Sequence, residues 1–334
     1  MWLLAAANSS FHFDDLINGF WDITISGLVL GAIYALVALG YTLVYGVLRL
    51  INFAHSEVWM LGAFGSFAAL WGFGVPTRLA NGNDPTKTGL VLVGMLLACL
   101  LVSMLFSGIA AVVVETFAYR PLRKKKAPRL NFLIAAIGAS FILAELVGIN
   151  GAKHREEYTL QRIFEKKVVF HIFSGQVRLN QIIVLVVALV MMLGLSKFVS
   201  STRTGRGIRA VAQDGETARL MGVNTDRIIL ITFIVGGMMA GAAAFFFEIT
   251  YGVARFNTGF QIGVKSFTAA VLGGIGNIRG AYLGGILLGL IELYTSVIFA
   301  DQKMGTVSAF VVLVLVLMFR PNGLLGESLS AARA

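Results

Sequence analysis

Charged residues are scarce in this sequence of 334 residues. They make up 13% of the chain, whereas hydrophobic residues make up 57%. A soluble globular domain carries about 25% charged residues, so this chain has too few to cover a water-facing surface. The composition therefore predicts that lipid is the solvent for most of the chain.

Cysteine is almost absent as well. The single cysteine, Cys99, lies within an apolar run, which excludes an internal disulfide framework and a multi-cysteine metal site. We expect no metal and no cofactor. The first residues, MWLLAAANSS, lack a basic stretch and a long apolar core, so we expect a mobile or interfacial N-terminus and no secretory signal.

Acidic residues are outnumbered, with 17 Asp and Glu against 27 Lys and Arg, which gives a net charge of +10. The basic residues cluster in a few loops between apolar runs. This pattern is typical of membrane orientation and does not indicate a nucleic-acid partner.

Long apolar runs are what the sequence does have. A window of about 19 residues, matched to the apolar core of a bilayer, picks out segments that could cross it. The 264–278 segment is short and rich in glycine, so it could be a half-helix. We predict an all-α polytopic helical bundle with about eight transmembrane helices, some of them broken or re-entrant. The predicted segments are 23–47, 56–74, 89–117, 130–149, 180–200, 228–250, 264–278, 280–299 and 305–320.

Loop charge predicts the orientation. The strongest basic stretches, 120–129 and 197–209, fall on one side of the membrane, which we expect to be the cytoplasm. Asp14, Asp15 and Asp22 then place residues 1–22 outside, followed by a transmembrane domain at 23–326 and a cytoplasmic tail at 327–334. The mixed-charge loop 150–179 faces outward as a docking surface or a plain solvated loop.

The chain contains two similar halves. The stretches LVYGVLR (43–49) and ITYGVAR (249–255) share Tyr-Gly-Val and a later Arg, and each follows a glycine-rich helix. Transporters use repeated halves to build a central site between two bundles. Several glycines also have the G-x-x-x-G spacing that lets helices approach closely in lipid. These pairs are Gly27 and Gly31, Gly237 and Gly241, Gly280 and Gly284, and Gly285 and Gly289.

A polar triplet, Asn52, His55 and Glu57, interrupts the apolar pattern of the first half. One interpretation ends the first helix by Leu50 and leaves the triplet at the membrane interface. The other interrupts that helix near Tyr45, so that the triplet dips into the bundle and faces a water-filled cavity. On the second interpretation the triplet and Tyr45 line a substrate pathway.

The second half has a corresponding polar stretch. Glu248 lies inside an apolar run, where it could line a pathway or merely pair with a nearby arginine. Because this region matches the first polar stretch, the same pathway is predicted to include Glu248, Tyr251, Asn257, Gln261 and Lys265.

The loop between the fifth and sixth predicted segments, residues 201–227, has helical spacing. Ile208, Val211, Ala212, Leu220 and Met221 can share one face, and Asn224 and Asp226 are candidates for capping the next helix. Glu216, Thr217, Ala218 and Gly222 form an E-x-A-x-x-x-G pattern after Asp214. The pattern predicts a compact helical knob that can fit a groove on a soluble partner.

Catalytic motifs are missing from the sequence. It contains no H-E-x-x-H, no G-x-S-x-G and no complete phosphate-binding G-x-x-x-x-G-K-[ST]. An enzyme is therefore not expected, and any ATP hydrolysis would belong to another subunit.

Four stretches together resemble the permeases of branched-chain amino acid ATP-binding cassette (ABC) importers, most closely the shorter H-type subunit. They are GAIYALVALGYTLVYGVLRLINFAHSEVWMLGAF, RAVAQDGETARLMGVNTDRI, KSFTAAVLGGIGNIRGAYLGGILLG and FRPNGLLG. The resemblance runs from about Ile23 to Gly326. Thr217 stands where the family has the middle alanine of an E-A-A triplet, and Ser56 stands where it usually has glycine after the histidine.

The resemblance implies a subunit of the bacterial inner membrane that translocates branched-chain amino acids. It implies a second related permease, two cytoplasmic ATP-binding subunits and an extracytoplasmic binding protein as partners. Asp214, Glu216, Ala218 and Gly222 would then belong to the helix that meets the ATPase. Two alternatives stay open, namely a urea or short-amide importer and a passive channel, which would not need this coupling segment.

Overall fold

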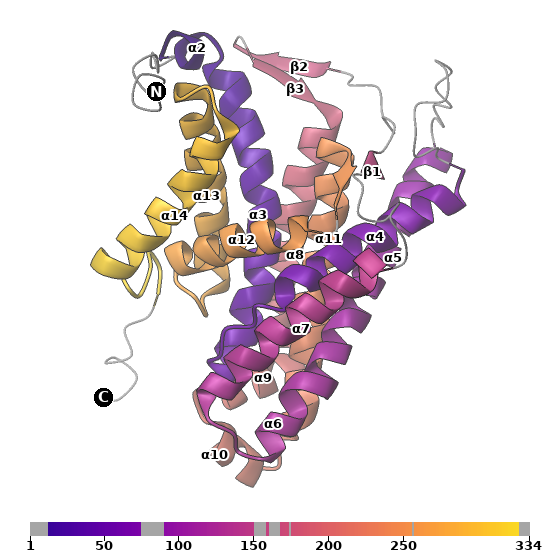
Figure 1. Ribbon diagram of the computed structural model, residues 1–334, viewed down its shortest axis with the longest axis vertical. Coiled ribbons are helices and arrows are strands. Elements are labelled where there is room, and N and C mark those ends of the chain that lie inside the picture. The colour runs from indigo at the N-terminus through magenta and orange to yellow at the C-terminus, as the bar shows by residue number, and fades with distance from the viewer. Residues whose placement is uncertain are drawn as a thin grey trace.

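The computed structural model describes residues 13–74, 90–149, 158–159, 168–173, 175–255 and 257–326. The predicted tail at 327–334 and the first twelve residues lie outside the described residues. The chain forms a bundle of helices with two small pairs of strands (Figure 1). The helices are α2 (Phe13–Asn18), α3 (Phe20–Leu48), α4 (His55–Gly72), α5 (Leu90–Val114), the π-helix η2 (Glu115–Tyr119), α6 (Arg120–Lys124), α7 (Arg129–Ile149), α8 (Leu179–Ser201), α9 (Arg203–Gln213), α10 (Gly215–Leu220), α11 (Thr225–Tyr251), α12 (Thr258–Gly273), α13 (Ile278–Ile298) and α14 (Gln302–Phe319).

Seven of these helical segments are long and apolar enough to cross a membrane. They include α3, α7, α8, α11, α13, α14 and the continuous stretch Val91–Lys124, which runs from α5 through η2 into α6. With α4, whose 18 residues begin with a polar turn, the described part of the chain has the eight long helices expected. Most of the 264–278 segment belongs to α12, which has only 16 residues, and the segment ends with the turn that leads into α13.

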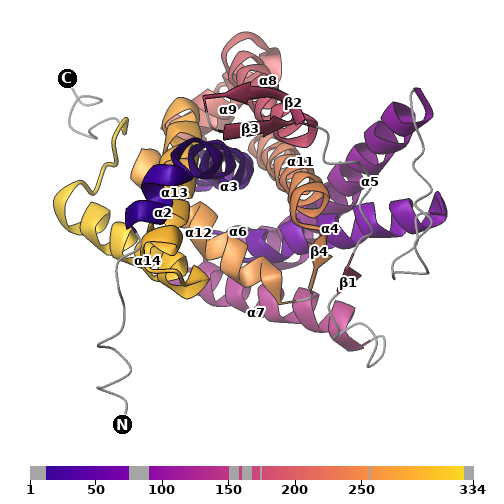
Figure 2. The same cartoon turned by 90° about the horizontal axis from the view of Figure 1, so that it is seen from above.

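The two similar halves are α3–α4–α5 and α11–α12–α13. The first helices of the halves pack against each other, and each also packs against the third helix of the other half. Seen from above, α13, α3, α11 and α5 therefore run across the molecule in this order (Figure 2). The core is therefore a single unit, because the first helix of each half is buried only with the help of the other half.

Glycines permit the contacts between the halves. A Cβ on Gly31 would lie 2.7 Å from the Cα of Ile286, and a Cβ on Gly289 would overlap the backbone N of Gly31. On the other side, a Cβ on Gly237 would lie 2.7 Å from the backbone O of Ser107. Helices in lipid associate through such close backbone packing. The predicted G-x-x-x-G faces of α3, α11 and α13 are thus internal contacts of the bundle.

The first helix is not interrupted near Tyr45, so this part of the second interpretation is wrong. The helix α3 continues to Leu48, and Arg49 then adopts a left-handed conformation with φ of 52° while its N–H donates to the carbonyl of Tyr45. This conformation ends the helix because the next peptide can no longer donate in the helical pattern. The chain re-enters the bundle only after this turn.

Short strands correct the all-α prediction locally. Strands β2 (Val168–Ile172) and β3 (Gly175–Arg178) form an antiparallel hairpin, and β1 (Tyr158–Thr159) pairs with β4 (Val253–Ala254). The hairpin rests on the start of α3, where Phe173 stacks on Trp21 with ring centroids 4.9 Å apart. Figure 1 places this hairpin and α2 at one end of the molecule and α6, α9 and α10 at the other.

We expect Gly31→Leu to destabilise the bundle strongly. A side chain at this position meets backbone atoms of α13, and overpacking of a core typically costs about 1–3 kcal/mol. The temperature at which the purified protein aggregates in detergent should fall. Gly94→Leu is the matched control, since nothing lies within 4 Å of a Cβ there. Equal thermal stability of the two variants would contradict the packing argument.

Candidate functional site

The first polar cluster lies at the start of α4. Asn52, His55 and Glu57 are only 2–3% exposed. The Asn52 Oδ1 accepts hydrogen bonds from the Ala54 N–H at 3.1 Å and from the Tyr119 hydroxyl at 3.2 Å. The triplet is therefore buried in the bundle, as the second interpretation held, although the helix ends as the first one held.

The Glu57 carboxylate is incompletely satisfied. Its Oε1 accepts hydrogen bonds from Ser140 at 3.4 Å and Ser56 at 3.5 Å, whereas Oε2 has no partner among the described residues. A Cβ on Gly259 of α12 would lie 2.7 Å from that free oxygen. The His55 Nε2 likewise has no hydrogen-bond partner in the part of the chain that the structure describes. Burying such groups costs free energy, which is why ionisable groups inside a bundle commonly mark a pathway.

A second buried carboxylate belongs to Glu248 on α11. The residue is 1% exposed, and its Oε2 accepts a hydrogen bond from the hydroxyl of Ser66 on α4. Its Oε1 has no partner among the described residues. Glu248 does not snorkel to the surface, and no arginine pairs with it in the described part of the chain. Like Glu57, it presents one free carboxylate oxygen inside the protein.

A buried ion pair joins the second half to α3. The Lys265 Nζ lies 2.5 Å from Glu292 Oε1, and the Tyr34 hydroxyl donates to Glu292 Oε2 at 2.9 Å. Lys265 was predicted from the sequence, but Glu292 and Tyr34 were not. The available signal was a single acid inside the apolar run of α13. Its partner lies 27 residues away in the chain, a separation that sequence spacing cannot connect.

The contacts of the predicted pathway residues fall into three groups. They divide among the Glu57 cluster, the Ser66–Glu248 contact and the Lys265–Glu292 pair. Tyr251, Asn257 and Gln261 are exposed, and Tyr45 is half-buried at the end of α3. Among the described residues, no group of His, Cys, Asp or Glu side chains could hold a metal ion.

The coupling segment forms two short helices at one end of the bundle. Asp214 caps α10, since its Oδ1 accepts from the Glu216 N–H at 2.9 Å and its Oδ2 from the Thr217 hydroxyl at 2.6 Å. These hydrogen bonds, the Thr217 hydroxyl first, hold the pKa of Asp214 below its usual value. The cap is therefore present at neutral pH and is lost only as the pH falls through that lowered value.

The C-terminal part of the coupling segment, residues 216–222, differs from the prediction. Ala218 is buried and Gly222 turns the chain with φ of 84°, while Glu216 is exposed. Leu220 and Met221, which were expected to share the buried face of Ile208 and Val211, are 88% and 80% exposed. The break between α9 and α10 redirects them, because the helical periodicity of α9 does not continue through the extended residue Asp214.

The two residues predicted to cap α11 have different roles. Asn224 Oδ1 accepts from the Arg227 N–H at 3.0 Å, which confirms the predicted cap. Asp226 instead lies 2.8 Å from Arg123, which also pairs with the buried Glu115 at 2.8 Å. This triad ties the start of α11 to the end of the α5–α6 helix.

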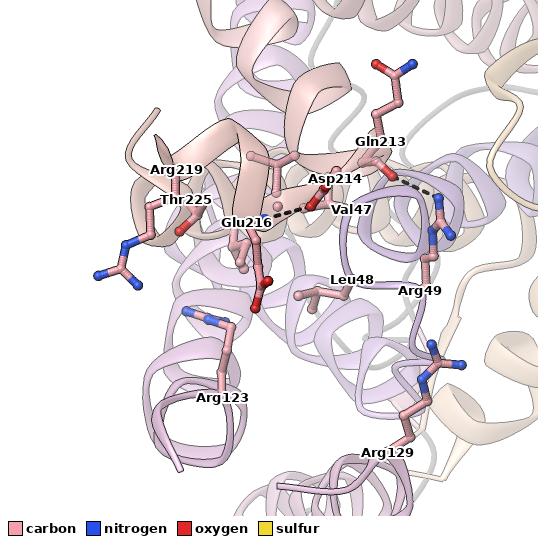
Figure 3. A pocket seen from close by; sticks show the side chains of 14 residues that line it. Val47, Leu48, Arg49, Arg123, Arg129, Gln213, Asp214, Glu216, Arg219 and Thr225 are labelled. Atoms are coloured by element: carbon pink, nitrogen blue, oxygen red, sulfur yellow. Dashed lines mark hydrogen bonds between the residues drawn. The ribbon is translucent and has the colours of Figure 1, made fainter. Parts of the chain in front are cut away.

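A cavity of about 390 Å³ lies behind the coupling segment (Figure 3). Its walls come from the end of α3, from α6, from the start of α7, from α9 and α10, and from the start of α11. Four arginines and two acids contribute to the lining together with apolar groups. The lining residues are Val47, Leu48, Arg49, Arg123, Arg129, Val211, Ala212, Gln213, Asp214, Gly215, Glu216, Arg219, Thr225 and Ile229.

These features define a polytopic helical membrane protein with buried ionisable groups and an exposed helical segment at one end. Residues 23–319 match the family described as the permease component of branched-chain amino acid transport systems. The chain belongs to this family. It is accordingly a transport subunit and not an enzyme.

Named relatives agree along nearly the whole chain. BraD, a high-affinity branched-chain amino acid transport system permease protein of Pseudomonas aeruginosa, is 41% identical over 311 residues, covering 91% of this chain and 94% of BraD. LivH of Escherichia coli K12 is 38% identical, with 90% and 94% of the two chains covered. LivH of Salmonella typhimurium is 39% identical, again with 90% and 94% covered.

We expect Lys265→Met to destabilise the protein, because it leaves the Glu292 carboxylate buried and unpaired. Removing one member of a buried pair costs about 3–5 kcal/mol, whereas replacing both with apolar groups is often neutral. Lys265→Met/Glu292→Leu should therefore regain most of the lost thermal stability in detergent. Lys303→Met, which removes an exposed lysine, is the control. A double variant as unstable as the single one would show that the pair itself holds α12 in place.

Proposed function

We propose that the chain is the translocating permease subunit of an ABC importer and moves branched-chain amino acids across the bacterial inner membrane. The observation that carries the proposal is the near full-length similarity to BraD and LivH, whose names state branched-chain amino acid transport. The exposed coupling segment supports ATP-driven transport over a passive channel, which would not need it.

The proposed assembly contains a second related permease, two cytoplasmic ATP-binding subunits and an extracytoplasmic binding protein. The sequence has no nucleotide-binding motif of its own, so the ATPase must be a separate chain. Leu220 and Met221 form an apolar tip beside the polar Glu216. Such a tip suits a groove on the ATPase, and the Asp214 cap and the Gly222 turn keep it in a defined shape.

The proposed orientation places α6, α9 and α10 in the cytoplasm and the hairpin β2–β3 outside. The basic stretches 120–129 and 197–209 support this, because cytoplasmic loops carry the excess of Lys and Arg. Both stretches lie at the same end of the molecule. This proposed orientation assigns residues 1–22 to the outside and the tail 327–334 to the cytoplasm.

The proposed substrate pathway uses the buried ionisable groups. An amino acid carries an ammonium and a carboxylate that need partners once water is removed. Glu57 and Glu248 each hold a free carboxylate oxygen that can accept from the ammonium. Lys265 can meet the carboxylate. In this proposal the exposed Tyr251 and the half-buried Tyr45 belong to the openings of the pathway.

Leucine uptake tests the proposed function. In cells with all partner subunits, uptake of labelled leucine should be competed by valine and isoleucine and should fall at least about tenfold in Glu216→Lys, since charge reversal disturbs the ATPase contact. Ser201→Lys adds a positive charge at the same end outside α10 and serves as the control. Membrane content of each variant is measured alongside uptake.

Each other outcome has a defined meaning. Competition by urea alone would assign the chain to a urea or short-amide importer. Uptake that is unchanged in Glu216→Lys would remove the role of the coupling segment and favour a passive channel.

The pathway has its own test. Glu57→Gln keeps the size of the side chain but removes its charge, so we expect leucine uptake to fall at least about tenfold through loss of a charge-assisted contact. Asp301→Asn is the matched control, because an asparagine can still cap α14. Wild-type uptake by Glu57→Gln, with normal assembly, would place the pathway elsewhere.

A further inference from the structure

The cavity behind the coupling segment lies at the ends of membrane-crossing helices. Arg49 directly follows the span Phe20–Leu48, Arg129 opens the span Arg129–Gly148, and Arg123 is the penultimate residue of Val91–Lys124. Residues at the ends of spans lie at the depth of the lipid headgroups. Three cavity arginines therefore lie at the ends of three different candidate spans.

Positive charge in the cavity is not neutralised by its own acids. Four arginines line it against two acids, Asp214 and Glu216, and Asp214 keeps its charge while it caps α10. Arg49 donates only to the Ala212 carbonyl, at 3.2 Å, and Arg129 has no hydrogen bond or ion pair among the described residues. Figure 3 shows Arg49 and Arg129 on one side of the cavity and Arg123 on the other.

Arg123 adds a buried donor without a partner. Two of its nitrogens bind Glu115 and Asp226, but its Nη1 is buried and has no hydrogen-bond partner among the described residues. A buried unpaired guanidinium nitrogen is costly. Arg123 itself lines the cavity, so the charge of this side chain can attract an anion bound there. Val47, Leu48 and Ile229 complete the lining with apolar surface.

We propose that this cavity binds the phosphate of an anionic phospholipid headgroup. The guanidinium groups supply the geometry that phosphate oxygens accept, and the apolar wall suits the glycerol and first acyl carbons. The volume of about 390 Å³ is within the range of small-molecule sites. Free phosphate offers the same oxygens but has no apolar part that could contact the apolar wall.

Lipid binding would act on the coupling segment directly. Gly215 and Glu216, at the start of α10, form part of the same cavity wall as Arg49 and Arg123. An occupied cavity holds α10 against the bundle, so anionic lipid promotes ATP-driven uptake. This consequence rests on the proposed function, whereas lipid binding itself does not.

Binding is measured on the purified complete transporter in a neutral detergent. Native mass spectrometry follows retention of phosphatidylglycerol, with phosphatidylcholine and inorganic phosphate as the other probes. We expect phosphatidylglycerol to bind and the affinity to fall at least about tenfold in Arg49→Gln/Arg129→Gln. Arg203→Gln/Arg206→Gln is the matched control, because it removes two exposed arginines of α9 outside the cavity.

The outcomes separate the possible ligands. If both double variants lost phosphatidylglycerol binding equally, general surface charge would explain the binding and the proposed site would be overturned. Equal binding of inorganic phosphate and phosphatidylglycerol would assign a free phosphate in place of a lipid. Loss of the ATPase subunits from the cavity variant, without a change in lipid binding, would assign the cavity to an acidic segment of the ATPase.

A second readout tests the consequence. Transporters in nanodiscs should hydrolyse ATP faster with phosphatidylglycerol than with phosphatidylcholine alone, and Arg49→Gln/Arg129→Gln should abolish the difference. Lipid binding without any effect on hydrolysis would keep the site but overturn its link to the coupling segment. Failure of leucine transport in the preceding experiment would leave the binding result unaffected.

Discussion

Close backbone contact between α3 and α13 is the constraint on which the rest of the bundle depends. Gly31, Gly285 and Gly289 bring the two helices together, and the equivalent contact of α11 with α5 uses Gly237 and Gly241. In lipid the hydrophobic effect does not drive helices together, so close packing must stabilise their association. The short helices α4 and α12 can re-enter the bundle because these four long helices form a rigid frame around them.

The buried polar groups follow from that frame. Both α4 and α12 begin after a left-handed turn at the end of the preceding long helix, at Arg49 and at Gly252. The polar first turn of α4 is thereby carried inside, where Glu57 faces Gly259, and the middle of α12 is buried where Lys265 meets Glu292. A polar residue in either position would lie in a loop if the chain simply turned back at the membrane surface.

The coupling end and the buried cluster are joined by a continuous set of contacts. Asp226 pairs with Arg123, which pairs with Glu115 at the start of η2, and Tyr119 at the end of η2 donates to Asn52. Single π-turns often occur at functional positions in helices. These contacts provide a physical route by which displacement of α10 and α11 can reach the buried polar cluster.

The sequence by itself determined the local features of this protein. Apolar length located the long helices, glycine spacing located their contact faces, and the cap at Asn224 followed from residue type. These properties depend on neighbours within one or two turns. Only the tertiary structure decided that the Asn52 triplet is buried, that Glu292 pairs with Lys265, and that Leu220 and Met221 point outward. It also brought Arg49, Arg123 and Arg129 to one cavity. Such contacts join residues far apart in the chain, so they depend on how the helices pack and not on periodicity along any one of them.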